Sequence, residues 1–249
     1  MGVCVVMNET QQLIKSLIEQ KGKQELGIDV VVEYVSDVNE RLLEIEDQCQ
    51  EKFNFVYETN KLTGIFIPSV GQKPYYILVQ KDRNDMLDIM TVFHEYRHLS
   101  DYITFLQTVF GGNVEEMKHS QLYITFNVYS EFSATLSGVL HYLKIVNKED
   151  MNQKELCETI LQYAKSAYWD LDGIINGYQL LVHSLQYFGN VIACSNFLKD
   201  INLEKIIDEM EFSNELKPIF AHILMFEDNN EWYKILDKRM RTFVDGVIV

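Results

Sequence analysis

The chain has 249 residues, which is long enough for a full hydrophobic core in one large domain or two small ones. Its residues are 47% hydrophobic and 24% charged, the balance of an ordinary soluble globular protein. With 37 acidic and 22 basic residues the formal net charge is -15, and such a surface repels a phosphate backbone, so we expect no direct binding to nucleic acid.

The cysteines and the amino-terminal residues indicate in which cellular compartment the protein is expected. The four cysteines contain no Cys-x-x-Cys pair and are widely scattered, as expected for reduced thiols rather than a disulfide framework: Cys4, Cys49, Cys157 and Cys194. The first residues lack the basic segment and long apolar run of a signal peptide, and no apolar run approaches the length of a membrane span. We therefore expect a cytoplasmic protein without membrane contact, whose natural start is either Met1 or Met7.

The amino-terminal segments alternate between helix and strand. Apolar residues at helical spacing predict a helix over 8–22, and the short β-branched run 27–35 predicts a strand. Asp37 and Glu40 have capping-box spacing, so a second helix is expected to start there. Three further strand-like runs follow at 53–58, 63–68 and 74–80, with 69–73 as a hairpin loop between the last two.

From residue 85 onward the pattern is helical. No proline occurs between Pro74 and Pro218, which permits a long series of helices, the first over 85–105. The sequence thus predicts a helix-dominated α+β fold in two parts. Residues 1–148 form a core in which a small sheet packs on the helix 85–105, and residues 149–249 form a helical extension packed on that core as one unit.

The stretch FHEYRH carries the chemistry. On a helix His94 and His98 lie one turn apart on the same face and can bind one ion. Glu95 is rotated away from them, where it can take a proton from a water that the ion activates. Two imidazole ligands and a nearby carboxylate are the needs of a zinc hydrolase. Because the motif lies in apolar sequence, these polar groups would be costly to bury without a partner.

A third protein ligand is needed, and acids downstream are the candidates. Asp101 follows His98 by one turn and is better placed to orient a ligand than to bind the ion. Glu115 and Glu116 lie in a polar segment that follows two glycines and reads as a solvated loop. Glu131 has apolar or small neighbours at helical spacing, so its carboxylate would point inward, where it needs a cation or hydrogen-bond donors. We prefer Glu131 as the third ligand.

With these residues in place, the chain resembles the ImmA/IrrE-type zinc metallopeptidases, a zincin group with His-Glu-x-x-His and a downstream Glu. The resemblance rests on FHEYRH, on the later SEFSA, and on the helix, strand, helix and sheet that precede the motif, over roughly residues 8–145. It implies a zincin-like core, with His94, His98 and Glu131 as zinc ligands and Glu95 as general base. Tyr96 and Arg97 are bulkier than the residues that this family usually has inside the motif.

By this resemblance the function is zinc-dependent hydrolysis of peptide bonds in a cytoplasmic, regulatory protein. An extended substrate is expected to pair with the strand YYILVQ as an edge strand beside the active helix. For the oxyanion donor we assign none of the nearby candidates, which are Tyr96, Tyr102, Tyr129, His141 and His183.

Two other classes of function compete with a peptidase. One is a catalytically silent zincin fold that binds a protein partner, which a substrate-facing Tyr96 or a helical half that blocks the cleft would favour. The other is a helical interaction protein without a metal. The sequence does not fix the substrate, the oligomeric state or the role of the helical half.

Overall fold

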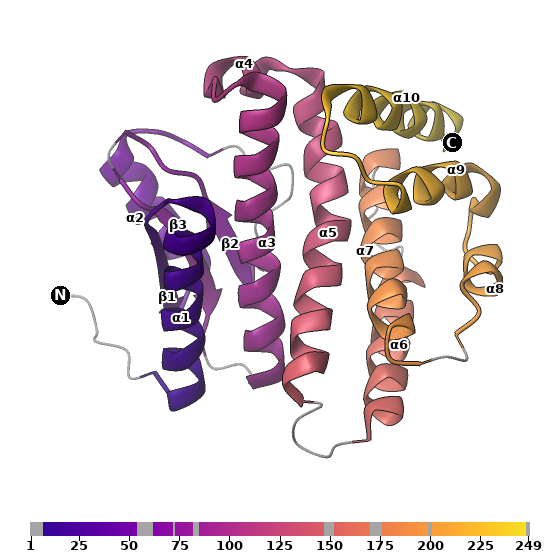
Figure 1. Cartoon of the computed structure of the whole chain (residues 1–249), viewed down its shortest axis with the longest axis horizontal. Coiled ribbons are helices and arrows are strands. Elements are labelled where there is room, and N and C mark those ends of the chain that lie inside the picture. Colours follow the sequence, from indigo (N-terminus) through magenta and orange to yellow (C-terminus); the bar gives the residue numbers. More distant parts are fainter. Residues whose placement is uncertain are drawn as a thin grey trace. The chain divides into compact units, whose positions relative to one another are not determined.

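The computed structural model describes residues 7–53, 62–71, 73–81, 85–146, 152–169, 176–198 and 201–247. These residues form mostly helices together with a three-stranded sheet (Figure 1), which confirms the helix-dominated α+β class. The chain divides into two compact units, Met1–Ser100 and Asp101–Val249. The predicted border between 148 and 149 falls among residues 147–151, which lie outside the described ones.

The first helix of unit 1 is the one predicted from spacing. Helix α1 (Glu9–Lys21) starts with a capping box, in which the Asn8 side chain accepts from the Gln11 amide and the Gln11 side chain accepts from the Asn8 amide. The helix then continues as a π-helical turn, η1 (Gly22–Leu26), which ends at Gly27 with φ 69°. Glycine adopts this left-handed conformation without strain, so the chain can turn into the first strand.

The three strands are β1 (Val30–Val35), β2 (Gly64–Ile67) and β3 (Tyr75–Gln80), in the order β1-β3-β2. β1 pairs with β3 in parallel, and β2 pairs with β3 antiparallel, which confirms the predicted hairpin. β3 is the central strand, so the prediction that YYILVQ is an edge strand is wrong: both of its edges are already paired. Of the further strand predicted at 53–58, residues 54–58 lie outside the described residues.

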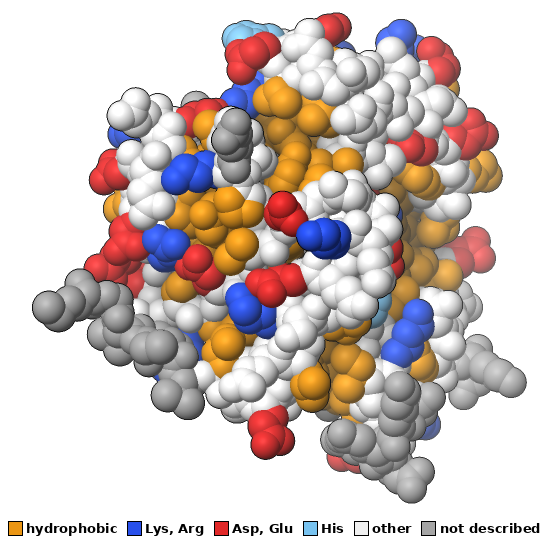
Figure 2. Space-filling model, turned by 60° about the vertical axis from the view of Figure 1, so that its left-hand side comes forward, with side chains coloured by type: hydrophobic (Ala, Val, Ile, Leu, Met, Phe, Trp, Pro, Cys, Tyr) orange, Lys and Arg blue, Asp and Glu red, His pale blue; other side chains and the backbone are white. Residues whose placement is uncertain are grey.

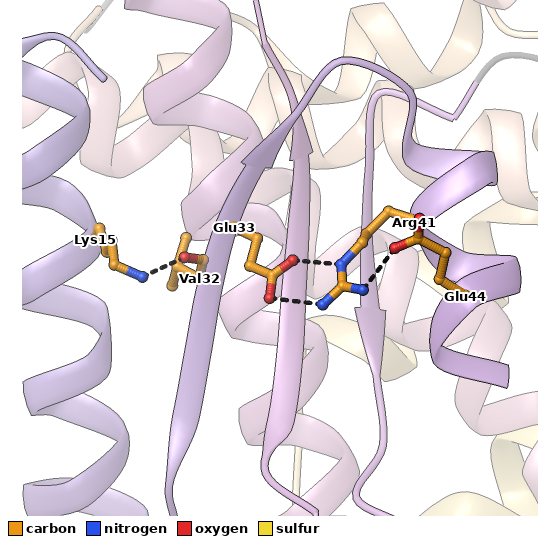
Figure 3. A network of polar contacts seen from close by, with 5 residues as sticks. All are labelled: Lys15, Val32, Glu33, Arg41 and Glu44. Atoms are coloured by element: carbon orange, nitrogen blue, oxygen red, sulfur yellow. Dashed lines mark hydrogen bonds and ion pairs between the residues drawn. The ribbon is translucent and has the colours of Figure 1, made fainter. Parts of the chain in front are cut away.

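One face of this sheet is covered by α2 (Val38–Cys49), whose first turn is capped by Asp37 as the sequence predicted. Three residues of α2 form a buried cluster with three residues of the hairpin: Val38, Leu42, Ile45, Ile65, Ile67 and Leu78. Arg41 of α2 donates two hydrogen bonds to Glu33 of β1 and one to Glu44 (Figure 3). The two-pronged guanidinium contact fixes α2 against β1.

Side chains of α1 satisfy the outer edge of β1. The Lys15 Nζ donates to the Val32 carbonyl at 2.5 Å (Figure 3), and the Val32 amide donates to Glu19 Oε1 at 3.1 Å. Lys15 and Glu19 also form an ion pair with each other. An edge strand presents unpaired backbone groups that can pair with another chain, and these side chains occupy those of Val32.

In the sequence, the border between the two units lies within α3 (Asp85–Phe110), directly after Ser100. After α3, Gly111 and Gly112 adopt positive φ and end the helix. The next residues form the short helix α4 (Val114–His119), whose first turn is capped by Asn113. The prediction of a loop for Glu115 and Glu116 is therefore wrong, although both residues are exposed. The asparagine after the glycines supplies the cap that starts this helix.

Unit 2 is built around two long helices, α5 (Gln121–Val146) and α7 (Gly177–Ser195). A β-carbon at Gly189 would lie 2.9 Å from the Phe132 carbonyl oxygen, so only glycine permits so close an approach of α7 to α5. The rings of Phe132 and Phe188 stack beside this contact with centroids 5.5 Å apart. The remaining helices are α6 (Gln153–Trp169), α8 (Leu203–Asp208), α9 (Ser213–Leu224) and α10 (Asn230–Val247), which confirms the predicted helical series.

Helix α10 packs on α5 through a buried polar contact and an aromatic cluster. Thr125 donates a 2.8 Å hydrogen bond to Asp237, which also accepts from Arg241. The aromatic rings around this contact come from α3, α5 and α10: Phe105, Phe126, Tyr129, Trp232 and Tyr233. No helix in the described part of the chain combines the length and the apolar character that a membrane span needs.

The charged surface is mixed on the face drawn in Figure 2. Among the side chains coloured there, acidic and basic groups are interspersed with apolar ones and form no large basic patch.

Candidate metal centre

Helix α3 carries the two histidines of the motif. It contains neither glycine nor proline over its 26 residues, so it can run straight through His94 and His98. Their Nε2 atoms lie 2.9 Å apart, and the rings meet edge to face with centroids 4.6 Å apart. The one-turn spacing thus brings the two imidazoles together, as the sequence predicted.

The contact between the two rings is a hydrogen bond, in which one Nε2 donates and the other accepts. A cation between them would need the lone pairs of both nitrogens, and would take the place of the shared proton. The two Nε2 atoms are therefore close enough together for both imidazoles to bind one cation.

Burial has a direct effect on the second histidine. It lowers the pKa of His98 to about 4, from an ordinary value of about 6.5. His98 is therefore neutral at neutral pH, which is the form in which an imidazole binds a metal.

We expect a specific pH dependence of stability in the metal-free protein. An unfolded His98 takes up a proton near about pH 6.5 and the folded one near about pH 4, so the unfolded state binds more protons in that window. His98 therefore lowers the free energy of unfolding by about 2–3 kcal/mol as the pH falls from about 7 to about 4.5. Urea unfolding in chelator at the two pH values, on wild type and His98→Gln, checks this. Equal losses in the two proteins would contradict it.

The structure adds one acid to the histidine pair. One ligand atom each from His94, His98 and Glu131 lie within 4.8 Å of one another. Two imidazole nitrogens and a carboxylate oxygen so close together form a group that could bind a metal ion. The remaining acids weighed for this role are not in the group. Asp101 is buried at 8% exposure, and Glu115 and Glu116 are exposed on α4.

Glu95 is rotated by about 100° from His94 on the same helical turn and lies beside β2 of unit 1. It is buried, with 8% of its surface exposed. A β-carbon at Gly64, the first residue of β2, would lie 3.2 Å from Cγ and Oε1 of Glu95 and 2.3 Å from Cγ2 of Thr91. The absence of a side chain at Gly64 is what allows β2 to pass directly over the Glu95 carboxylate.

Tyr96, the bulky residue inside the motif, is held within unit 1. It is 7% exposed, and its hydroxyl donates a 3.1 Å hydrogen bond to Oε2 of Glu25. The Lys21 Nζ lies 5.8 Å from the centre of its ring and forms an ion pair with Glu25. Burial and the bond to Glu25 raise the pKa of the Tyr96 hydroxyl well above its usual range. Tyr96 thus ties α3 to the π-helical turn.

Because the contacts of Tyr96 are internal, Tyr96→Phe is expected to lower the stability of unit 1. The ring stays under Lys21 while the hydrogen bond to Glu25 is lost, so the free energy of unfolding should fall by about 1 kcal/mol. Urea unfolding of the variant and of the wild type measures this change. An unchanged free energy of unfolding would mean that the bond to Glu25 does not contribute to stability.

Of the other oxyanion donors considered from sequence, Tyr129 and His141 also have internal contacts. Tyr129 is 4% exposed and packs against Phe226 and Trp232. A ring nitrogen of His141 is bonded to the Ser137 carbonyl oxygen of its own helix. We assign neither as a donor.

Sequence reasoning missed two residues near the candidate metal centre. Gln186 of α7 donates a 2.8 Å hydrogen bond to Oε2 of Glu131. No local motif marks this glutamine, because the two residues are 55 positions apart. Gly64 had a usable signal, since a glycine inside a strand pattern often marks the close approach of another group.

The chain was also compared with known proteins. No protein-family model, no curated protein and no solved structure matches it.

Proposed function

We propose that this chain is a zinc-dependent metallopeptidase of the kind it resembles, the ImmA/IrrE-type zincins. The observation that carries the proposal is the group formed by His94, His98 and Glu131, with Glu95 next to His94 in sequence. Three protein ligands of this type, with a fourth position left open, are the pattern of catalytic zinc sites.

The donor set favours zinc over the other common cations. Calcium and magnesium take oxygen ligands almost entirely, whereas two imidazole nitrogens and one carboxylate suit zinc. In a tetrahedral zinc site with bonds of about 2.1 Å, the ligand atoms stand about 3.4 Å apart. The three atoms of this group lie within 4.8 Å of one another, within reach of such a site by side-chain rotation.

Zinc bound there would supply Lewis acidity, which lowers the pKa of water and polarises a scissile carbonyl. The chain itself supplies the base. The Glu95 carboxylate takes the proton of the attacking water and passes it to the leaving amine. Its burial beside Gly64 restricts its motion, so the carboxylate is oriented before substrate arrives.

Strand β2 is the surface that we assign to the substrate. β2 has a partner on one side, β3, within the described sheet, so its other edge can pair with an extended peptide. Gly64 at its start lies over Glu95, and a peptide aligned there would present a peptide bond near the base. We thus assign substrate pairing to β2 instead of β3, the strand expected from the sequence.

A cytoplasmic, regulatory protein as substrate is part of the same proposal. The described cysteines are free thiols, and burial raises the pKa of Cys157 and Cys194, which disfavours the reactive thiolate. The competing role as a silent partner-binding fold drew on a substrate-facing Tyr96. Because Tyr96 is buried and bonded to Glu25, it does not support that role.

Elemental analysis of the purified protein tests the metal site. We expect about one zinc per chain in the wild type and a loss of most of that zinc in His94→Ala, because two ligands alone hold the ion weakly. His119→Ala serves as the matched control, because it makes the same change at an exposed histidine of α4 outside the ligand group, and its zinc content should match the wild type. Wild-type protein without stoichiometric zinc, or His94→Ala with full zinc, would refute the site.

A further inference from the structure

The carboxylate of Glu131 has a hydrogen-bond donor from a distant part of the chain. Gln186 of α7 places its Nε2 2.8 Å from Oε2 of Glu131 on α5. We propose that Gln186 is a positioning residue of the metal centre, which holds the Glu131 carboxylate in the orientation in which it binds the ion. This inference rests on the proposed zinc site.

The chemistry of the two groups fixes the direction of this bond. An ionised carboxylate only accepts hydrogen bonds, so the NH₂ end of the glutamine amide must face it. An amide donor holds the carboxylate without neutralising it, whereas a lysine or arginine would offer a competing positive charge. Gln186 therefore fixes the orientation of Glu131 and preserves its charge for a cation.

The helix pair is built so that this bond can form. Gly189 lies one turn after Gln186, and its missing side chain lets α7 approach the backbone of α5 at Phe132, the neighbour of Glu131. The rings of Phe132 and Phe188 stack beside this close approach, with their centroids 5.5 Å apart. The Asn190 side chain donates to the Gln186 carbonyl at 2.8 Å and supports the helix at this turn. Packing thus places the amide before any ion binds.

A role for Gln186 extends the metal centre into the carboxy-terminal helices. Groups that hydrogen-bond to metal ligands orient them, and their loss typically weakens metal binding by about 10- to 100-fold. The helical extension would then contribute to the affinity for zinc, in addition to its packing.

Zinc affinity, measured by competition with a chromophoric chelator, tests this role without any need for a substrate. Gln186→Met keeps the length of the side chain and removes both amide donors, so we expect its dissociation constant for zinc to rise by about 10- to 100-fold. Gln179→Met makes the same change two turns earlier on the same helix, and its affinity should equal that of the wild type. The thermal unfolding of all metal-free proteins is measured alongside.

A double-mutant cycle separates positioning from a general effect on structure. If Gln186 acts through the Glu131 carboxylate, Gln186→Met should weaken zinc binding in the wild-type background and cause no further loss in Glu131→Ala. Equal fold-losses in both backgrounds, or unchanged affinity in the single variant of a zinc-binding wild type, would overturn the inference and leave the zinc site intact. A wild type that binds zinc no better than His94→Ala would overturn both.

Discussion

Glu95→Gln is expected to retain zinc at the wild-type level and to hydrolyse peptides at least about a hundredfold more slowly. Glu95 is buried, with 8% of its surface exposed. Because glutamine has nearly the same size as glutamate, the packing around position 95 should be kept. The amide cannot take up the proton of the attacking water, and so the variant loses the general base alone. Measured together, zinc content and initial rate separate this effect from a loss of the metal.

A mixture of synthetic peptides of random sequence can serve as substrate, with the products read by mass spectrometry. Glu116→Gln is the matched control, because it makes the same change at an exposed glutamate of α4. The control should cleave at the wild-type rate. Hydrolysis by Glu95→Gln at that same rate would assign the base to another residue, and zinc binding without any hydrolysis by the wild type would favour the silent fold.

Gly64→Ala is expected to disturb the same site from the sheet side. The new β-carbon would lie 2.3 Å from Cγ2 of Thr91 and 3.2 Å from the Glu95 side chain, so β2 or α3 must shift. Thr91 is β-branched and stiff, and cannot turn away easily. Overpacking of this kind costs about 1–3 kcal/mol of unfolding free energy. We also expect slower hydrolysis, because Glu95 is displaced.

Two further variants make the cause identifiable. Thr91→Ser removes Cγ2, so Gly64→Ala combined with Thr91→Ser should recover most of the lost stability in urea unfolding. Gly246→Ala on α10 has open space within 4 Å and should leave both stability and hydrolysis close to wild type. If the double variant is as unstable as Gly64→Ala alone, the contact with Thr91 is not the reason.

The helices could be predicted where local chemistry decides. The capping signal at Asp37 lies within a few residues of the amides that it bonds, so the start of α2 could be predicted from sequence. The strand order was less accessible. β3 became the central strand because β1 pairs with it across about 45 residues of chain, and no local pattern encodes such a pairing.

In the candidate metal centre too, contacts within one helix could be predicted, and contacts between distant segments could not. His94 and His98 share one helical turn, so helical spacing alone predicts their contact. Glu131 was preferred because its helical neighbours are apolar or small, which indicates an inward-facing carboxylate. Gln186 and the buried hydroxyl of Tyr96 could not be placed in this way. Their partners, Glu131 and Glu25, are set by the packing of distant segments.

The order of the sheet also has a consequence for how unit 1 forms. The hairpin of β2 and β3 closes a short loop, whereas the pairing of β1 with β3 must close a loop of about 45 residues. The hairpin can therefore form early, and β1 joins it late, together with α1, whose Lys15 and Glu19 bond to Val32. Until then β3 presents an apolar open edge, with Ile77, Leu78 and Val79 unprotected. A nascent chain is thus most prone to self-association before its own amino-terminal segment has docked.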